Sequence, residues 1–181
     1  MSPGRYLPDH DFPPAPAGTR VRLVTLLTFV AVAGVAIALP VATRRPHAGP
    51  VWVPFAAAAV ALLVVTGIWF GSRIRGYRLT AAELLVRLRF RTVRFPLAQL
   101  QDVAPDREAL RGAWKQAGND GLGAISGRFR SRRLGRFRAY VTDSDRAVVL
   151  RWPDFCLVIS PDQPAWFVEN ARRHAGQTTP R

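Results

Sequence analysis

The chain has 181 residues, of which 49% are hydrophobic, and it carries 26 Lys and Arg against 12 Asp and Glu, a formal net charge of +14. This composition is too apolar for a disordered basic tail and too charged for a protein that lies in a membrane throughout. The charge is unevenly distributed, because residues 72–181 hold 21 of the basic and 10 of the acidic side chains. The sequence therefore divides near residue 72 into an apolar part and a basic part.

The first 20 residues form a proline-rich leader, with Pro at positions 3, 8, 13, 14 and 16. Proline fixes φ and lacks an N–H, and few apolar residues accompany these prolines. We therefore expect a disordered N-terminal tail over residues 1–20. A proline-rich ligand for a partner protein is the alternative interpretation of this segment.

Two apolar stretches without a charge follow within residues 21–71, at 23–43 and 51–71. Each has 21 residues, which as a helix span about 31 Å, close to the hydrocarbon thickness of a bilayer. Trp52 and the pair Trp69-Phe70 suit the interfacial positions that aromatic rings favour. The pattern predicts a two-span transmembrane hairpin, because two buried helices of a soluble protein would need polar positions that these stretches lack.

The arginines that flank the two stretches predict their orientation. Five lie before the first stretch or after the second, and two lie in the connecting loop; they are Arg20, Arg22, Arg73, Arg75 and Arg78 against Arg44 and Arg45. By the positive-inside rule, both termini are expected in the cytoplasm, with the protein multi-pass in the cell membrane. A signal peptide cleaved near Ala38 is the alternative, which the long apolar stretch and the long leader disfavour.

Residues 72–176 predict a mainly β domain, and residues 177–181 a short tail. Apolar and arginine residues alternate with period two between Leu84 and Phe90 and again between Arg128 and Arg138. Further strands are expected at 77–80, from Val93 towards Val103, and at 136–142, 147–152 and 155–160. The pattern favours a strongly twisted, partly open antiparallel barrel. Whether residues 104–126 form a loop or a helix stays open.

A helix is predicted at the C-terminal end of this domain. Ser160 suits the N-cap, Pro161 the first helical position and Gln163 the third, which is a capping-box pattern, and Gly176 is a suitable end. Trp166 and Phe167 follow at the start of the helix and are expected to plug the open end of the barrel.

Several features argue against catalysis. The single cysteine, Cys156, lies in an apolar strand with no histidine nearby in sequence, and the three histidines are far apart in the chain. The glycines at 118, 121, 123 and 127 match neither a dinucleotide-binding loop nor a P-loop, and they favour a loop or a strand entry. The acidic residues Asp102, Asp106 and Glu108 lack a partner base. We expect no enzyme, no metal and no cofactor.

The order of two spans, short strands and a C-terminal helix resembles that of bacterial membrane-attached PH-domain proteins. The likeness covers residues 72–175, and its motifs are Tyr77-Arg78-Leu79-Thr80, the strand that runs from Val93 to Val103, Gly127-Arg128-Phe129, the stretch Leu134–Asp143, and Val158-Ile159-Ser160-Pro161. The resemblance implies a pleckstrin-homology-like (PH-like), partly open barrel closed by a C-terminal helix. It also implies a non-enzymatic domain that binds proteins or a membrane surface, although a fold does not fix a ligand.

The candidate binding residues form an arginine-rich hairpin: Arg128, Arg130, Arg132, Arg133, Arg136 and Arg138. On paired strands these side chains would crowd on one face, and like charges directly opposite each other destabilise a sheet. Anionic lipid headgroups of the cytoplasmic leaflet would offset this repulsion. A solvated face is the plainer interpretation. Nucleic acid is disfavoured, because Phe129 and Phe137 are expected on the opposite, core-facing side, where they cannot stack on bases.

These observations together predict a membrane-anchored PH-like binding or scaffold module. Its expected partners are the lipid bilayer, an unidentified protein and possible anionic headgroups. The alternative is an accessory subunit of a transport or envelope-assembly complex that acts mainly through its transmembrane hairpin. Small residues at Ala33-Gly34 and in Ala56–Ala61 would allow close helix packing in such a complex.

Overall fold

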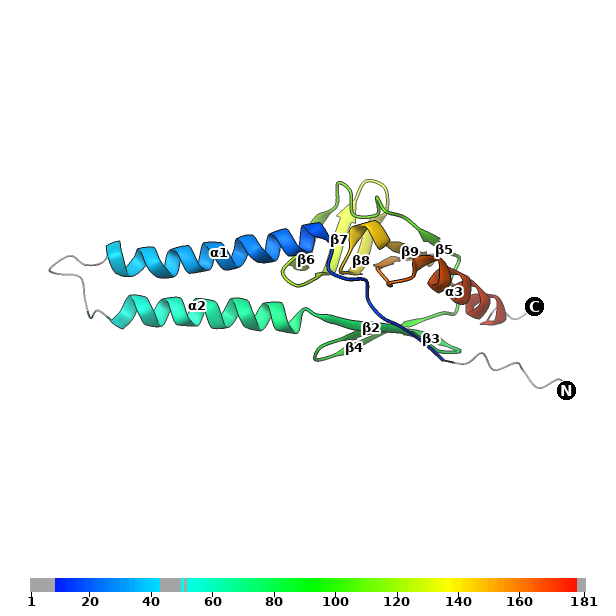
Figure 1. Cartoon of the computed structure of the whole chain (residues 1–181). Helices are drawn as coiled ribbons and strands as arrows, with labels where there is room; N and C mark the ends of the chain where they lie inside the picture. Colours follow the sequence, from blue (N-terminus) through cyan, green and yellow to red (C-terminus); the bar gives the residue numbers. More distant parts are fainter. Residues whose placement is uncertain (1–8, 43–49, 51, 179–181) are drawn as a thin grey trace.

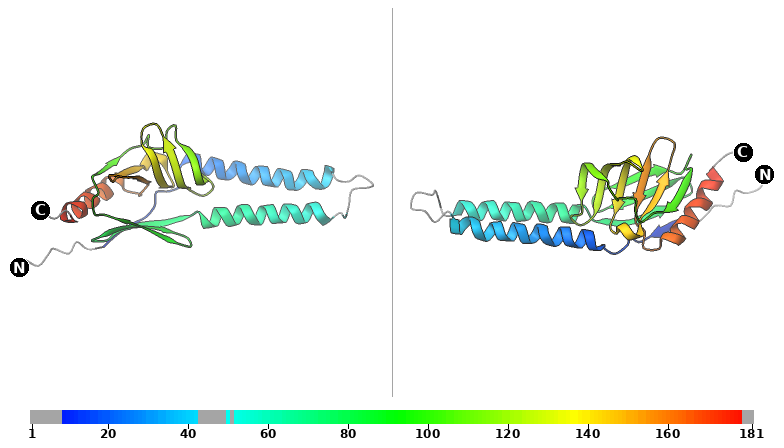
Figure 2. Two further views of the ribbon diagram at one scale, coloured as in Figure 1. Left: turned by 180° about the vertical axis from the view of Figure 1, so that it is seen from behind. Right: turned by 90° about the horizontal axis from the view of Figure 1, so that it is seen from above.

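The computed structural model describes residues 9–42, 50 and 52–178. Figure 1 shows an elongated molecule in which two long helices extend from one end of a β-rich domain, and a third helix lies at the other end. The helices are α1, Thr19–Ala42, and α2, Trp52–Gly71. All three views place them side by side (Figures 1 and 2).

Both long helices are apolar enough and long enough to cross a membrane, and their side chains are almost entirely exposed. The first begins at Thr19, four residues before the predicted stretch. The chain leaves the β domain at this point, where Gly18 N donates to Thr142 O and Arg22 N donates to Gly18 O. Residues 43 and 51, at the ends of the predicted spans, lie outside the described residues.

The first sheet has four antiparallel strands in chain order. They are β1, His10–Phe12, β2, Ile74–Leu79, β3, Glu83–Leu88, and β4, Thr92–Pro96. Strand β2 continues directly from the end of α2, so the β2–β3 turn lies far from the helices and the β3–β4 turn lies beside them (Figure 1).

The prediction of a disordered tail over residues 1–20 is wrong for residues 9–20, and residues 1–8 lie outside the described residues. Strand β1 pairs with β2, so that Phe12 lies opposite Tyr77 and its ring is 1% exposed. Beyond it, Ala15 N donates to Ser160 O at 2.9 Å, which attaches the leader to the second sheet. Prolines between these contacts cost little, because each sits where no N–H is required. We call residues 9–18 the N-terminal strap.

The second sheet has six strands in the order β5-β9-β10-β8-β7-β6. They are β5, Asp102–Pro105, β6, Trp114–Asp120, β7, Ile125–Ser131, β8, Gly135–Val141, β9, Val148–Arg151, and β10, Cys156–Ile159, with a 3₁₀ turn at Ser144–Arg146. The two sheets do not close into a barrel. Strand β10 forms an antiparallel hairpin with β9 and pairs with β8 on its other side, where the two strands run parallel. The predicted antiparallel pairing is therefore wrong between β8 and β10. Residues 104–126, left open as a loop or a helix, form the end of β5, strand β6, the start of β7 and the turns between them.

Two apolar clusters hold the domain together, one on each face of the second sheet. The larger lies between the two sheets and includes Tyr77, Leu157 and Phe12. The smaller lies on the outer face, where Phe129 and Phe137 are covered by the turn at Ala109-Leu110. Strands β8, β9 and β10 contribute side chains to both clusters, as expected for strands that are covered on two sides.

The C-terminal helix, α3, runs from Pro164 to Thr178. The predicted capping box is wrong, because Ser160 is fully buried at the end of β10, and its hydroxyl accepts hydrogen bonds from the backbone N–H groups of Thr142 and Asp143. The helix begins instead at Pro164, a residue whose missing N–H costs nothing at a first helical position. Phe167 is fully buried in the core as predicted, whereas Trp166 is exposed beside Phe12.

Candidate functional site

Strands β7 and β8 bring four of the six candidate arginines together on one face. In the observed register Arg128 lies directly opposite Arg138, and Arg130 lies directly opposite Arg136. All four are exposed, whereas Phe129 and Phe137 are buried and stack at 5.9 Å on the other side of the sheet. We call these four residues the arginine face. The aromatic rings between them are inaccessible to bases, as the alternation predicted.

The other two candidate arginines lie in the β7–β8 turn and do not join this face. Arg133 forms an ion pair of 2.5 Å with Asp106, a residue of the turn that follows β5. The Asp106 carboxylate raises the pKa of Arg133 above its ordinary value. Arg132 is exposed at the tip. The hairpin therefore provides a cluster of four arginines, with one further free cation at its end among the described residues.

The arginine face lacks compensating carboxylates. Among the described residues, no Asp or Glu forms an ion pair with any of its four side chains, although nine other arginines of the chain do form such pairs. The nearest charge-stabilising contact is that of Arg138, whose guanidinium lies 6.0 Å from the ring centre of Phe95. Two directly opposed like-charge pairs cost roughly 0.2 to 1 kcal/mol each in a sheet. The face therefore carries positive charge that no carboxylate of the described residues compensates.

The β6–β7 turn joins the arginine face to the helical hairpin. The Ser72 hydroxyl, just after α2, donates to Leu122 O at 2.6 Å, and the Thr25 hydroxyl of α1 donates to Gly121 O and accepts from Gly123 N. An ion pair of 2.9 Å links Arg20 to Asp120. We call residues 120–124 the junction loop. Since it contacts both helices, β7 starts directly at their base, as Figures 1 and 2 show.

Two glycines make this contact possible. A Cβ on Gly123 would lie 2.8 Å from Trp69 O, and one on Gly121 would lie 3.2 Å from the Val24 side chain. Both have positive φ, at +78° and +111°, which L side chains rarely adopt. Sequence reasoning missed this junction. The series of glycines between 118 and 127 was the feature of the sequence that could have indicated it. The sequence interpretation assigned these glycines to a loop or a strand entry and not to a contact with the helices.

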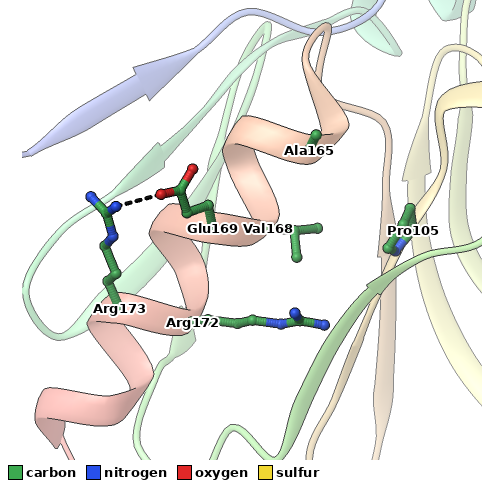
Figure 3. Close-up of a pocket in the computed structure, with 6 residues that line it drawn as sticks. All are labelled: Pro105, Ala165, Val168, Glu169, Arg172 and Arg173. Carbon is green, nitrogen blue, oxygen red and sulfur yellow. Dashed lines mark hydrogen bonds and ion pairs between the residues drawn. The ribbon is translucent and has the colours of Figure 1, made fainter.

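A shallow apolar groove lies at the opposite end of the second sheet, between α3 and β5 (Figure 3). Figure 3 shows Val168 and Arg172 on the side of α3 that faces β5, with the Glu169–Arg173 ion pair on the other side. Arg172 donates from Nε and Nη2 to Val103 O, at 3.1 and 2.7 Å. Because Arg172 occupies this carbonyl and Pro105 has no N–H, the edge of β5 is closed to strand addition.

Within residues 9–42, 50 and 52–178, no three His, Cys, Asp or Glu side chains gather in a way that could hold a metal ion. Cys156 is half-buried and packs against the outer cluster. Asp102 and Glu108, two of the acidic residues considered in the sequence, form exposed ion pairs with Arg151 and Arg111.

The comparisons with known proteins point to one family. The sequence pattern described as "Bacterial PH domain" matches residues 75–175, more than half of the chain. No curated protein and no solved structure gives a significant match. The matched region begins in β2 and ends within α3, so it comprises both sheets except for the strap, and proteins of this kind generally bind rather than catalyse. The resemblance inferred from the sequence is confirmed: the chain belongs to the bacterial PH domain family.

Proposed function

We propose that this protein is a non-enzymatic binding module held at the cytoplasmic face of the cell membrane by its helical hairpin. Both helices expose apolar side chains along most of the length for which the structure describes side chains, and a bilayer would stabilise this surface better than water. Arginines gather at the end that carries the β domain, and this supports a cytoplasmic location for that domain and for both termini.

The ligand that we propose for the arginine face is the anionic headgroup layer of the membrane. The observation that carries this is the opposed pairing of Arg128 with Arg138 and of Arg130 with Arg136, without a carboxylate partner among the described residues. An arginine near an anionic surface contributes about 1 kcal/mol, which exceeds the repulsion within each pair. The junction loop supports the proposal, since it keeps β7 beside the helix ends, within reach of headgroups.

Lipid selectivity of the full chain tests this proposal. The protein is placed in bilayers of phosphatidylcholine and phosphatidylglycerol, and electron paramagnetic resonance measures how much of each spin-labelled lipid it immobilises at low salt. We expect a preference for phosphatidylglycerol that falls with added salt. Replacing the arginine face with glutamine, R128Q/R130Q/R136Q/R138Q, is expected to remove most of this preference.

The matched control removes four exposed arginines from other parts of the domain, R107Q/R111Q/R146Q/R173Q, and so makes the same change in net charge. Equal loss in both variants would indicate general charge attraction and would contradict a specific face. A wild-type protein without any preference for the anionic lipid would contradict headgroup binding and favour an acidic protein segment as the ligand.

A second candidate function is that of an accessory subunit that acts through the hairpin. A Cβ on Gly34 or on Gly67 would meet no atom within 4 Å, so neither glycine serves the packing of α1 against α2. Small residues on an exposed apolar helix favour close contact with another transmembrane helix. Replacing both with leucine is expected to abolish the recovery of a membrane partner after crosslinking, whereas the glutamine variant of the arginine face should leave it unchanged.

A further inference from the structure

Among the described residues outside the two long helices, the β3–β4 turn carries the most exposed large apolar side chain. Phe90 is 75% exposed and lies between Arg89 and Arg91. Isolated exposed apolar residues are common on protein surfaces and need no explanation by themselves. The position of this one is different, because the turn lies directly beside the end of α2 (Figure 1).

Backbone hydrogen bonds fix the turn at this place. Leu88 N donates to Arg91 O at 2.8 Å, which closes the turn, and Arg89 N donates to Arg73 O at 3.0 Å, which ties it to the chain that leaves α2. The Phe90 ring lies against the backbone of Gly71, where a Cβ would come within 3.3 Å of it. The turn therefore holds a constant position relative to the last residue of the helix.

The apolar surface of α2 continues without a break onto this turn. The rings of Phe70 and Phe90 lie 6.1 Å apart, and Phe70 is itself exposed. Two guanidinium groups lie over aromatic rings at the same level: that of Arg89 is 4.2 Å from the centre of Phe70, and that of Arg73 is 4.6 Å from the centre of Trp69. Aromatic rings beside arginines whose charged heads remain in contact with water are characteristic of a membrane–water interface.

We propose that the β3–β4 turn, Arg89-Phe90-Arg91, contacts the membrane in addition to the two helices. The turn inserts Phe90 into the interface beside α2, while its two arginines lie among the headgroups. This inference rests on the proposed membrane location of the hairpin, and it does not depend on the arginine face. The occupant that fits is the bilayer, because the exposed ring adjoins the end of a helix that is long and apolar enough to cross a membrane. The contact would fix the tilt of the β domain relative to the membrane.

Site-directed spin labelling of the full chain tests this. In a C156S background, which leaves no native cysteine, a nitroxide is attached at F90C in nanodiscs of phosphatidylcholine alone. Two further labels serve as references: A82C in the β2–β3 turn, at the other end of the same strands, and L63C, an exposed position within α2. The measurement compares collisions with oxygen, which concentrates in the bilayer, and with a water-soluble nickel complex.

We expect the ratio of oxygen to nickel collisions at position 90 to exceed that at position 82 several-fold and to be lower than that at position 63. Equal ratios at 90 and 82, with position 63 in lipid, would overturn the membrane contact and leave the membrane location intact. A water-exposed label at position 63 would overturn both. Because the bilayer is uncharged, a failure of headgroup binding at the arginine face leaves this result unchanged.

A second pair of variants retains the turn and tests Phe90 itself. The label is placed at T92C, an exposed position at the start of β4, with Phe90 either retained or replaced by serine. We expect F90S to lower the oxygen-to-nickel ratio at position 92, because the turn loses its apolar insertion. An unchanged ratio would show that the backbone alone sets the depth of the turn and would overturn the role assigned to Phe90.

Discussion

The helical hairpin and the β domain are both rich in apolar residues but place them in opposite ways. In the hairpin, Leu63 is 71% exposed and no residue of α2 is buried. In the β domain, every strand except β6 contributes buried residues to one or both clusters, and residues such as Leu157 are fully buried. The difference indicates that the two parts suit two environments. The domain excludes water from its own interior, whereas the hairpin exposes an apolar surface that a surrounding apolar phase would stabilise.

The N-terminal strap lies before the hairpin in the chain but belongs to the β domain, and the largest effect is expected there. F12A should destabilise the domain by about 3 to 5 kcal/mol, because it removes a ring that is buried among Tyr77, Trp166 and Phe167. The matched control is F55A in α2, whose ring is 55% exposed.

The readout for this pair is hydrogen exchange of strands β7 to β10 in the full chain in detergent micelles. F12A is expected to speed exchange throughout these strands, and F55A to leave it near that of the wild type. Equal protection in F12A and the wild type would show that the strap does not contribute to the stability of the domain.

A charge placed in the hairpin is expected to weaken membrane insertion and to leave the stability of the β domain unchanged. L63R should weaken membrane insertion by about 2.5 to 3.5 kcal/mol, because it places a cation near the middle of an apolar span, while the β domain keeps its protection. The control is Q116R, at an exposed position of β6. Carbonate extraction of membranes measures insertion. If L63R and Q116R remain in the membrane to the same extent, α2 does not span it.

A pH titration addresses the interior of the domain alone. Burial raises the pKa of Tyr77 to about 12, and its hydroxyl donates to Tyr140 O and accepts from Ser160 N. The folded state resists deprotonation of Tyr77 more than the unfolded state does. The contribution of the protonated Tyr77 hydroxyl to the free energy of unfolding is therefore complete below pH 10 and is lost as the pH rises towards 12. The loss is about 3 kcal/mol for the two pH units. The full chain should therefore lose stability between these values, more steeply than Y77F, in denaturant titrations that follow strand β8.

Y77F itself is expected to be less stable at neutral pH by about 1 to 3 kcal/mol, since it leaves Ser160 N and Tyr140 O without a buried partner. Parallel pH profiles for the wild type and Y77F would contradict the assignment of this titration to Tyr77.

The smallest effect is expected at the surface of the strap. Asp11 forms ion pairs with Arg78 and Arg87, and its hydrogen bond with Arg78 lowers the pKa of the carboxyl below its ordinary value. The carboxylate is exposed, so D11N should cost less than about 1 kcal/mol. The control is D154N, an exposed residue without an ion pair in the described part of the chain. A cost for D11N near that of F12A would mean that the strap is held by charge rather than by burial.

Local periodicity explains which features could be predicted. The period-two alternation of β7 and β8 predicted an exposed arginine face opposite buried Phe129 and Phe137, and the structure confirms this arrangement. The charge-free stretches likewise predicted two apolar helices. In each case the pattern is set by which residues neighbour one another along the chain, and it needs no distant contact.

Features that depend on distant contacts were missed or mistaken. Strand β1 has only three residues within a proline-rich segment, and it exists because the edge of β2 accepts it. Ser160 has the sequence environment of an N-cap, but its hydroxyl instead accepts a hydrogen bond from the backbone N–H of Thr142, at the end of the neighbouring strand β8. Arg133 pairs with Asp106, 27 positions earlier in the chain, so this predicted arginine does not belong to the arginine face.

The sequence by itself determined that a charge-free apolar segment precedes a basic, strand-rich domain, because hydropathy and alternation are properties of the chain. Only the tertiary structure decided how these parts are joined. The strap pairs with β2, the junction loop forms hydrogen bonds with α1 and with the residue that follows α2, and the β3–β4 turn places Phe90 beside the end of α2. Such contacts link residues 20 to 100 positions apart in the chain. They form because strand edges, unpaired backbone groups and aromatic rings become paired or buried only when distant segments meet.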